Sequence, residues 1–248
     1  MREDGSMTQE ERRALRILRG YGDPACYEEM AQVIVRGGAD GISADEDGVL
    51  LHHRRADLYM IAAKNEARVM ELVDEIPPHA TDVLLHGDYA PELVTRVRIH
   101  FHLRHALRFV MYAYYGEVPE PEREADIRPL GIGALDFLDA HYGHASREYV
   151  AARLEDGVML GAYVDGRLAA FIGEHIEGSM GMLHVMPDYR RHHLGYALER
   201  AAIRRTMLAG HTPFDQVVPE NEASHALQDR LGMTRACGAL YWITDDTF

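Results

Sequence analysis

Short apolar runs alternate with longer amphipathic segments along the chain of 248 residues. A short apolar or β-branched run between turn residues is typical of a buried strand, whereas apolar positions recurring every third or fourth residue predict a helix. In the N-terminal part, this pattern predicts two short helices within 7–22 and 27–38, strands at 48–54, 58–63, 82–87 and 106–115, and helices at 65–76 and 91–101.

The same reading of the C-terminal part predicts a similar alternation. Asp165-Gly166 is a good hairpin turn between two strands, and Gly232 is typical of the residue that follows a helix. The predicted strands are 126–130, 158–164, 168–176, 181–186, 214–218 and 239–244, and the predicted helices are 135–143, 146–157, 194–208 and 224–231.

The stretch GEVPEPERE, residues 116–124, has two prolines, four glutamates and no apolar period, which is linker composition. It divides the chain into 1–115, the linker 116–124 and 125–248. The order strand, helix, strand, helix, strand occurs on both sides of the linker. We therefore expect an α/β protein of two tandem halves that share one fold, with mixed, mostly antiparallel sheets flanked by helices.

Composition narrows the class of protein. The chain is 47% apolar and 27% charged, as soluble globular proteins are, and it has no apolar run long enough for a transmembrane helix or a signal core. Cys26 and Cys237 fit no metal or redox spacing, so we expect reduced thiols and a cytoplasmic protein. The net charge of −14 argues against nucleic acid and anionic membranes as partners.

One basic cluster stands out against this acidic background. Arg190, Arg191, His192 and His193 directly precede the predicted helix 194–208, and Gly195 lies in its first turn. The first turn of a helix has unpaired N–H groups and positive potential, so this site suits a pyrophosphate. The N-terminal part has only AKNEAR, residues 63–68, at the corresponding place.

The strand before the cluster adds a second requirement on the ligand. Pro187 removes an N–H and marks the point where sheet pairing stops. A strand that parts from its neighbour there can bind an extended amide chain as an added strand. Coenzyme A has an amide chain at one end and a pyrophosphate at the other.

These residues resemble the GCN5-related N-acetyltransferase (GNAT) superfamily. Its signature Arg/Gln–x–x–Gly–x–Gly/Ala falls on Arg190, His193 and Gly195, and VPENEASHALQDRLGM, residues 218–233, is similar to its second landmark. The resemblance implies two GNAT-like halves, with a degenerate N-terminal copy, as in the FR47-like and glycine N-acyltransferase-like group. It also implies an acyl-CoA, most simply acetyl-CoA, as co-substrate, and no metal.

The resemblance implies a role for each matching residue. Backbone groups of Leu183, His184 and Val185 would hold the pantetheine arm, and Asn221 and Ser224 would lie beside the thiol. The pyrophosphate would bind the turn formed by Arg190, Arg191, His192, His193, Leu194, Gly195 and Tyr196.

The sequence departs from the family pattern at two positions. His193 replaces the first glycine of the signature, and Gln228 replaces a tyrosine that protonates the departing thiolate; a neutral amide cannot donate that proton. Tyr241 is a candidate substitute. The candidate general bases are Glu174, which we rank first because it interrupts an apolar strand, then Glu177 and His184.

The expected reaction is direct transfer of an acyl group to an amine of a small molecule or peptide, with backbone donors near Val185 stabilising the thioester oxygen. Two alternatives stay open: an acyl-CoA-binding sensor without activity, and a partner-binding protein that has lost the cofactor. Glu174 can simply face solvent, His184 can be a packed strand residue, and Asn221 can cap a helix. The acceptor, the acyl chain length and a homodimer are left open by the sequence.

Overall fold

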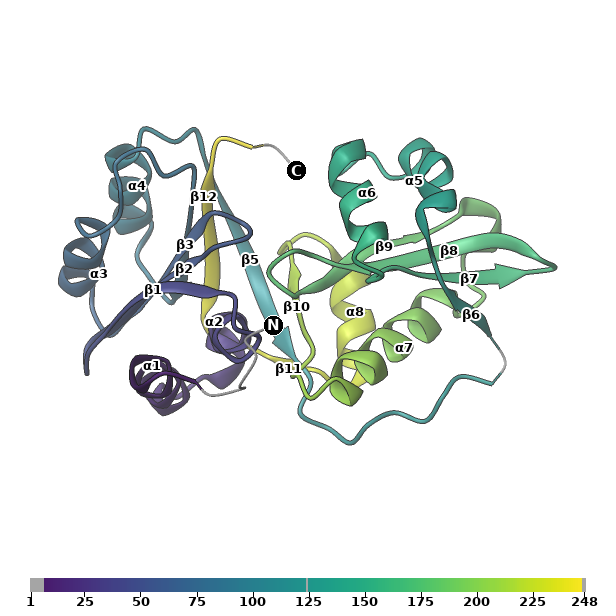
Figure 1. Ribbon diagram of the computed structural model, residues 1–248, viewed down its shortest axis with the longest axis horizontal. Helices are drawn as coiled ribbons and strands as arrows, with labels where there is room; N and C mark the ends of the chain where they lie inside the picture. The colour runs from purple at the N-terminus through teal and green to yellow at the C-terminus, as the bar shows by residue number, and fades with distance from the viewer. Residues whose placement is uncertain (1–6, 124, 247–248) are drawn as a thin grey trace.

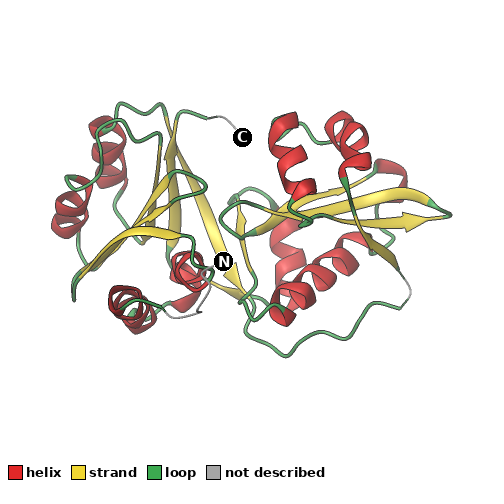
Figure 2. Cartoon of the chain, viewed as in Figure 1, coloured by secondary structure: helices red, strands yellow, loops and turns green. Residues whose placement is uncertain are grey.

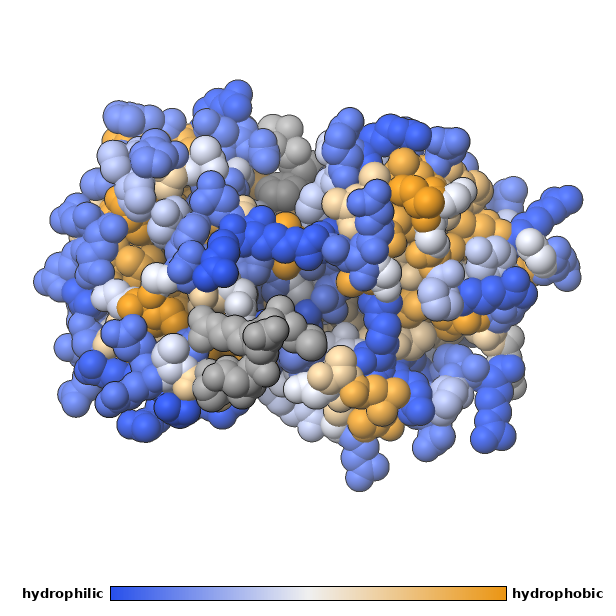
Figure 3. Space-filling model, viewed as in Figure 1, coloured by the Kyte–Doolittle hydropathy of each residue, from blue (hydrophilic) through white to orange (hydrophobic). Residues whose placement is uncertain are grey.

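The structure is a computed structural model and describes residues 7–123 and 125–246. Figure 1 shows two halves side by side, with helices on both faces of the strands in each half. Figure 2 shows the same layering by element type. Hydrophilic side chains cover most of the face seen in Figure 3, with smaller apolar patches on both halves.

The N-terminal half packs two helices on each face of its strands. Along β2, Val49 and Leu51 point toward α1 and α2, whereas Leu50 points toward α3 and α4, so both faces of this strand are apolar. The elements are α1 (Gln9–Gly20), α2 (Pro24–Val35), β1 (Ala39–Ala44), β2 (Gly48–His53), β3 (Leu58–Ala63), α3 (Glu66–Val73), β4 (Asp82–Gly87), α4 (Pro91–His100) and β5 (His105–Ala113).

The C-terminal half repeats the order of two helices, three antiparallel strands, a helix, a strand and a second helix, after one additional strand. Helices α5 and α6 cover one face, and α7 and α8 cover the other. The elements are β6 (Asp126–Pro129), α5 (Leu135–His141), α6 (Arg147–Glu155), β7 (Leu160–Val164), β8 (Arg167–Glu174), β9 (Met180–Val185), α7 (Leu194–Leu208), β10 (Phe214–Val217), α8 (Glu222–Leu231), β11 (Thr234–Arg235) and β12 (Ala239–Thr244).

Within the described residues, the strands of both halves join in one sheet of twelve. They join because β5 of the N-terminal half pairs with β10, and because β12 of the C-terminal half inserts between β4 and β5. The order is β1-β2-β3-β4-β12-β5-β10-β9-β8-β7-β6, and β11 also pairs with β5. Strand β5 continues the sheet into the C-terminal half through β10. The last strand, β12, lies between β4 and β5, as Figure 1 shows by its yellow arrow among the N-terminal strands.

The sequence analysis found the helices and most strands, and the structure differs at three places. Residues 239–244 are a strand, but placing them with the C-terminal strands was wrong, since β12 belongs to the N-terminal part of the sheet. Strand β1 was not predicted, because Asp40 and Gly41 interrupt its apolar pattern at a bulge. Strand β11 has two residues, too few for any pattern.

The segment between β5 and β6 contains no helix or strand in its described residues. It is held against α7 by two arginines of that helix. Arg204 donates to the Pro119 carbonyl at 2.7 Å, and Arg200 lies 2.6 Å from the Glu122 carboxylate. The connection is therefore packed on the surface of the C-terminal half rather than detached from it.

Candidate functional site

The turn between β9 and α7 presents a row of backbone N–H groups. Arg191 and His193 have left-handed backbone angles, with φ of 67° and 60°. The first N–H bonded within the helix is that of Ala197, which donates to the His193 carbonyl at 3.0 Å. Among the described residues, no oxygen accepts from the N–H groups of residues 191–196, and no side chain caps the helix. These donors are available to an anion.

Cationic and ring nitrogen groups surround this turn. The side chains of residues 190–193 are exposed. Arg230 of α8 donates to Nδ1 of His193 at 3.2 Å, and its guanidinium lies 4.5 Å from the centre of the Tyr196 ring. The His193 ring therefore points toward α8, and its backbone N–H remains a donor, although the left-handed conformation explains why glycine suits this position.

The strand before the turn parts from its parallel neighbour. Strands β9 and β10 are paired at one position, Met180 with Asp215. Beyond Met180, β8 is the only strand in the described part of the chain that pairs with β9. The edge of β9 that faces β10 thus has peptide groups without a strand partner, which is the arrangement that binds an added extended chain.

A bulge in β9 lies directly after this parting point. Gly181 pairs with Gly173 and His184 pairs with Phe171, so β9 has one extra residue opposite β8. Met182 in the bulge has a φ of 54°. A bulge bends its strand and increases the local twist, which turns the end of β9 away from β10.

Gly195 brings the basic turn close to the parted strand. A β-carbon placed on Gly195 would lie 3.6 Å from Leu183 and 3.7 Å from Val185, so an alanine would fit and a longer side chain would fill the space above β9. Arg190 turns back and donates to the Val185 carbonyl at 3.3 Å. The predicted residues of β9 and of the turn therefore lie in one continuous region.

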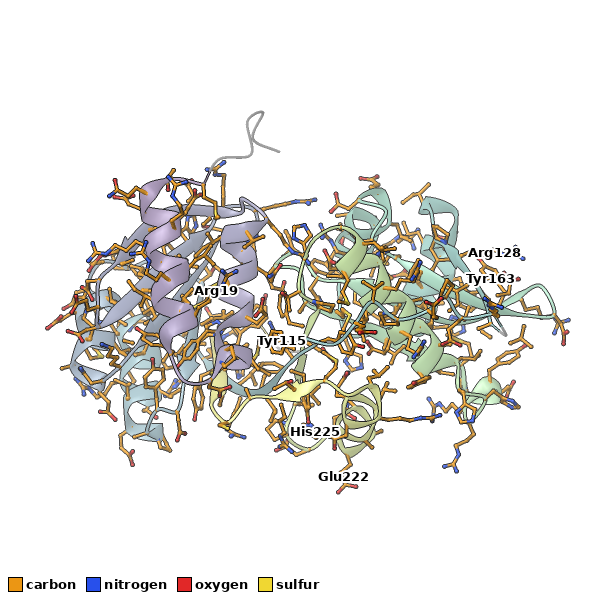
Figure 4. The ribbon with its side chains drawn as sticks, turned by 90° about the horizontal axis from the view of Figure 1, so that it is seen from below. Arg19, Tyr115, Arg128, Tyr163, Glu222 and His225 are labelled. Carbon is orange, nitrogen blue, oxygen red and sulfur yellow. The ribbon has the colours of Figure 1, made fainter. Side chains whose placement is uncertain are left out.

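Asn221 and Ser224 begin α8, which follows β10. The Asn221 side chain accepts from the Ser224 N–H at 3.1 Å and caps the helix, as one of the two sequence interpretations proposed. Figure 4 shows Glu222 pointing away from the body of the protein in this first turn. His225 is tied inward, since its Nδ1 lies 2.9 Å from the Tyr112 hydroxyl.

The candidate catalytic residues do not all meet. His184 on β9 stacks on Phe171 with 5.5 Å between ring centres and faces α5 and α6. Burial, Arg190 and two nearby histidines lower the pKa of His184, which keeps it neutral at pH 7. Glu174 ends β8 and accepts from Arg36 of the N-terminal half at 2.7 Å.

Tyr241 lies apart from these residues. It is on β12, which β5 and β10 separate from β9. Its hydroxyl donates to the Tyr89 carbonyl at 3.3 Å, and its ring packs with the core beneath α3 and α4. The structure does not bring Tyr241 to the turn or to the parted strand.

Gln228 is buried beneath α7 and α8 with two carboxyl groups. Its Nε2 donates to Asp215 of β10 at 2.5 Å, and Glu199 of α7 lies 3.5 Å away. Burial raises the pKa of Asp215 to about 7, and burial together with Asp215 raises the pKa of Glu199. The two carboxyl groups therefore hold at least one proton near neutral pH.

Sequence reasoning missed Arg230, the bulge at Met182 and the Asp215–Glu199 pair. Arg230 looks like any exposed helix residue until α8 is packed against α7. Glu199 has a sequence signal, because it lies one turn before Ala202 and Ile203 on the apolar face of its helix. The bulge has none, since Met182 is an ordinary strand residue by type.

Two further properties of the described residues bear on the class of protein. No helix among them is long and apolar enough to cross a membrane. No three histidine, cysteine, aspartate or glutamate side chains in this part of the chain are placed to hold a metal ion.

Comparison with known proteins identifies relatives of the C-terminal half and of the whole architecture. Residues 157–243 match the family model of FR47-like proteins. A sequence comparison with curated proteins finds no match. Similar solved structures include a Drosophila protein, a GCN5-related N-acetyltransferase from Kribbella flavida, and a GCN5-related N-acetyltransferase-like protein from Streptococcus suis.

These three structures resemble nearly the full length of the chain. The Drosophila protein is 17% identical with a TM-score of 0.61, covering 96% of this chain and 97% of its own. The Kribbella protein is 15% identical (TM-score 0.54; 95% and 96% covered), and the Streptococcus protein is 11% identical (TM-score 0.52; 96% and 99% covered). At these identities the likeness establishes the fold alone.

Proposed function

We propose that this chain, whose residues 157–243 match the FR47-like family model, is an acyltransferase of the GNAT type that transfers an acyl group from an acyl-CoA to an amine. Acetyl-CoA is the proposed donor, and the acceptor is an amine of a small molecule or peptide. The proposal depends chiefly on one observation: the unpaired N–H groups of residues 191–196 and the free edge of β9 meet at Gly195.

The residues present fit a ligand with a diphosphate and an amide chain. The turn supplies backbone donors, and Arg190, Arg191 and Arg230 add positive charge, with no carboxylate among the described residues bonded to any of them. The free edge of β9 would pair with the amide groups of the pantetheine arm through Leu183 and Val185. When bound, acyl-CoA supplies a thioester, whose carbonyl carbon is open to attack by a neutral amine.

Residues around the bulge would stabilise the thioester oxygen and accept the amine proton. Backbone N–H groups of β9 that face the parting would donate to the thioester oxygen, where charge develops. Holding both substrates in line is expected to contribute more than any single side chain. His184 is neutral and lies on β9, so it can accept a proton, whereas Glu174 is engaged by Arg36.

One observation favours the alternative of an acyl-CoA sensor without activity. Gln228 stands where the family has a proton-donating tyrosine, and its amide is bonded to Asp215 rather than open to a ligand. A sensor would bind acyl-CoA through the same turn and strand edge but release no thiol.

Two measurements separate the readings. Isothermal titration with CoA tests the binding site, and we expect a saturable signal that is lost in the double variant R190A/R191A. Release of free thiol from acetyl-CoA with a panel of primary amines tests transfer. Binding without amine-dependent thiol release would establish the sensor, and absence of any CoA binding would remove both readings.

A further inference from the structure

The turn that joins β8 to β9 places a histidine ring against the backbone of β9. The His175 N–H donates to the Ser179 carbonyl at 2.8 Å, and the Gly178 N–H donates to the His175 carbonyl at 3.0 Å, so the turn is tight. A β-carbon built on Gly181 would lie 2.6 Å from Nε2 of His175. The ring therefore occupies the space that a side chain at Gly181 would take.

A tyrosine of α6 fixes the other side of this ring. The Tyr149 hydroxyl lies 2.9 Å from Nδ1 of His175 and accepts from the Ile176 N–H at 3.2 Å. Burial raises the pKa of Tyr149, so the phenol stays protonated. The tautomer in which Nδ1–H donates to Tyr149 leaves a lone pair on Nε2, and Nε2 has no hydrogen-bond partner within the described residues.

Nε2 lies beside the residue at which the proposed pantetheine groove ends. β9 and β10 are last paired at Met180, Gly181 is the next residue, and the bulge at Met182 follows. His175 approaches Gly181 from the side covered by α6, whereas Leu183 and Val185 face Gly195 on the side covered by α7. An amine approaching Gly181 from the α6 side would pass Nε2.

Two glutamates near this point are already engaged, and His184 stacks on Phe171 three residues further along β9. Glu174 is bonded to Arg36 of α2, and Glu177 of the same turn is buried and accepts from the Ser179 hydroxyl at 2.5 Å. Arg153 of α6 lies over the far side of the Tyr149 ring, 5.6 Å from its centre. Of these groups, His175 is the one with an open nitrogen beside the parting point.

We propose that Nε2 of His175 accepts the proton of the acceptor amine and that Tyr149 is the residue that positions the ring. This inference rests on the proposed function. In the step, the amine nitrogen forms a bond to the thioester carbon and the carbon–sulfur bond breaks. The amine proton passes to Nε2, and it returns from His175 to the departing thiolate or to water, giving the amide and free CoA thiol.

The kinetic test compares H175Q with Y149F across pH, using amine-dependent release of thiol from acetyl-CoA. General base catalysis contributes about 10² to 10⁴-fold, so H175Q should lower kcat/KM by at least about 100-fold at pH 7. The loss should shrink toward pH 10, where the amine is already neutral. Y149F retains the imidazole, so its loss should be about 10-fold, with a shifted acid limb of the pH profile.

Matched controls and a spectroscopic measurement test whether the loss in H175Q comes from a disturbed structure rather than from the missing base. His79 is exposed in the N-terminal half, and H79Q should leave kcat/KM unchanged. CoA affinity by isothermal titration should be the same in wild type, H175Q and Y149F. In ¹⁵N-histidine spectra, His175 should carry its proton on Nδ1, and Y149F should change that tautomer balance.

Each failure points to a different conclusion. An H175Q loss that is equal at pH 7 and pH 10, or no loss at all, would overturn the role of His175 while leaving the transferase intact. A neutral His175 protonated on Nε2 would overturn it as well. A wild-type protein that releases no thiol with any amine would instead refute the proposed function itself, and the base with it.

Discussion

The two halves follow the same order of elements, but they differ in how far the third antiparallel strand is paired with the parallel strand beside it. In the N-terminal half, β3 and the parallel β4 are paired at four positions, from Tyr59 with Val83 to Ala62 with His86. In the C-terminal half, β9 and β10 are paired at one. The register of β2 with β3 is unbroken, whereas β9 has a bulge against β8.

The helices that follow these strands also differ in whether a side chain caps the N-terminus. Asn65 caps α3 by accepting from the Arg68 N–H at 3.0 Å, whereas α7 begins at left-handed His193 without a side-chain cap. Tyr89 fills the end of β3, where its hydroxyl bonds both the N–H and the carbonyl of Ala63. One fold is thus closed by its own side chains in the first half and left open to a ligand in the second.

The largest expected effect comes from placing a negative charge in the open turn. Gly195→Glu puts a carboxylate in the first turn of α7, where it favours the helix but repels a diphosphate. A like charge about 4 Å away costs several kcal/mol at a partly exposed site, so CoA binding should weaken by at least about 100-fold in titration calorimetry.

The control for this change is Ala67→Glu, at the corresponding second position of α3. It should leave CoA affinity within about twofold. If both variants weakened binding equally, the N-terminal turn would share the site, and the contrast between the halves would be lost.

A second prediction concerns the cores beneath the helices. The core under α3 and α4 is apolar, whereas the corresponding core of the C-terminal half contains Asp215 and Glu199. The pKa of Asp215 is raised from 3.8 to about 7, so folding favours its protonated form. That contribution is complete below pH 4 and is lost as pH rises through about 7.

We therefore expect Asp215 to lower the free energy of unfolding by roughly 2 kcal/mol between pH 5 and pH 7, at about 1.4 kcal/mol per unit of pKa shift. Asp215→Asn cannot titrate and should remove most of this slope. Urea unfolding of both proteins at pH 5, 6 and 7 measures the difference. Parallel slopes would show that Asp215 is ionised throughout.

The smallest expected effect comes from restoring the family's glycine in the open turn. His193→Gly relieves a left-handed conformation that costs a side-chain-bearing residue about 1 kcal/mol or more, but it also removes the contact with Arg230. Because the free protein already has this conformation, the gain should appear as a free energy of unfolding about 1 kcal/mol higher in urea denaturation, with CoA affinity within about twofold in titration. Weaker binding would indicate that the His193 ring itself contacts the ligand.

Pattern and local chemistry predicted most of the elements and the basic turn. Residues 58–63 form a continuous apolar run because both faces of β3 are buried, and residues 194–208 show a helical period because one face of α7 is buried. The arginines and Gly195 mark the proposed anion site because helix N-termini present unpaired donors wherever they occur. The signature residues therefore identified the turn before any packing was known.

The neighbours of each strand and the partners of the acid–base residues were decided by the tertiary structure. A strand's sequence shows that it pairs but not with which neighbour, so the position of β12 between β4 and β5 could not be foreseen. The same holds for acid–base chemistry. Glu174 as a base seemed the best choice on its strand, but a partner 138 residues away engages it.

By itself, the sequence determined the helices, most of the strands and the chemistry of the turn at 190–196, because these depend on residues adjacent in the chain. The tertiary structure alone decided that β9 parts from β10, that β12 joins the other half, and that His175 lies over Gly181 beside Tyr149. These three features depend on contacts between segments that are distant in the chain, and a local sequence pattern does not indicate which distant groups come into contact.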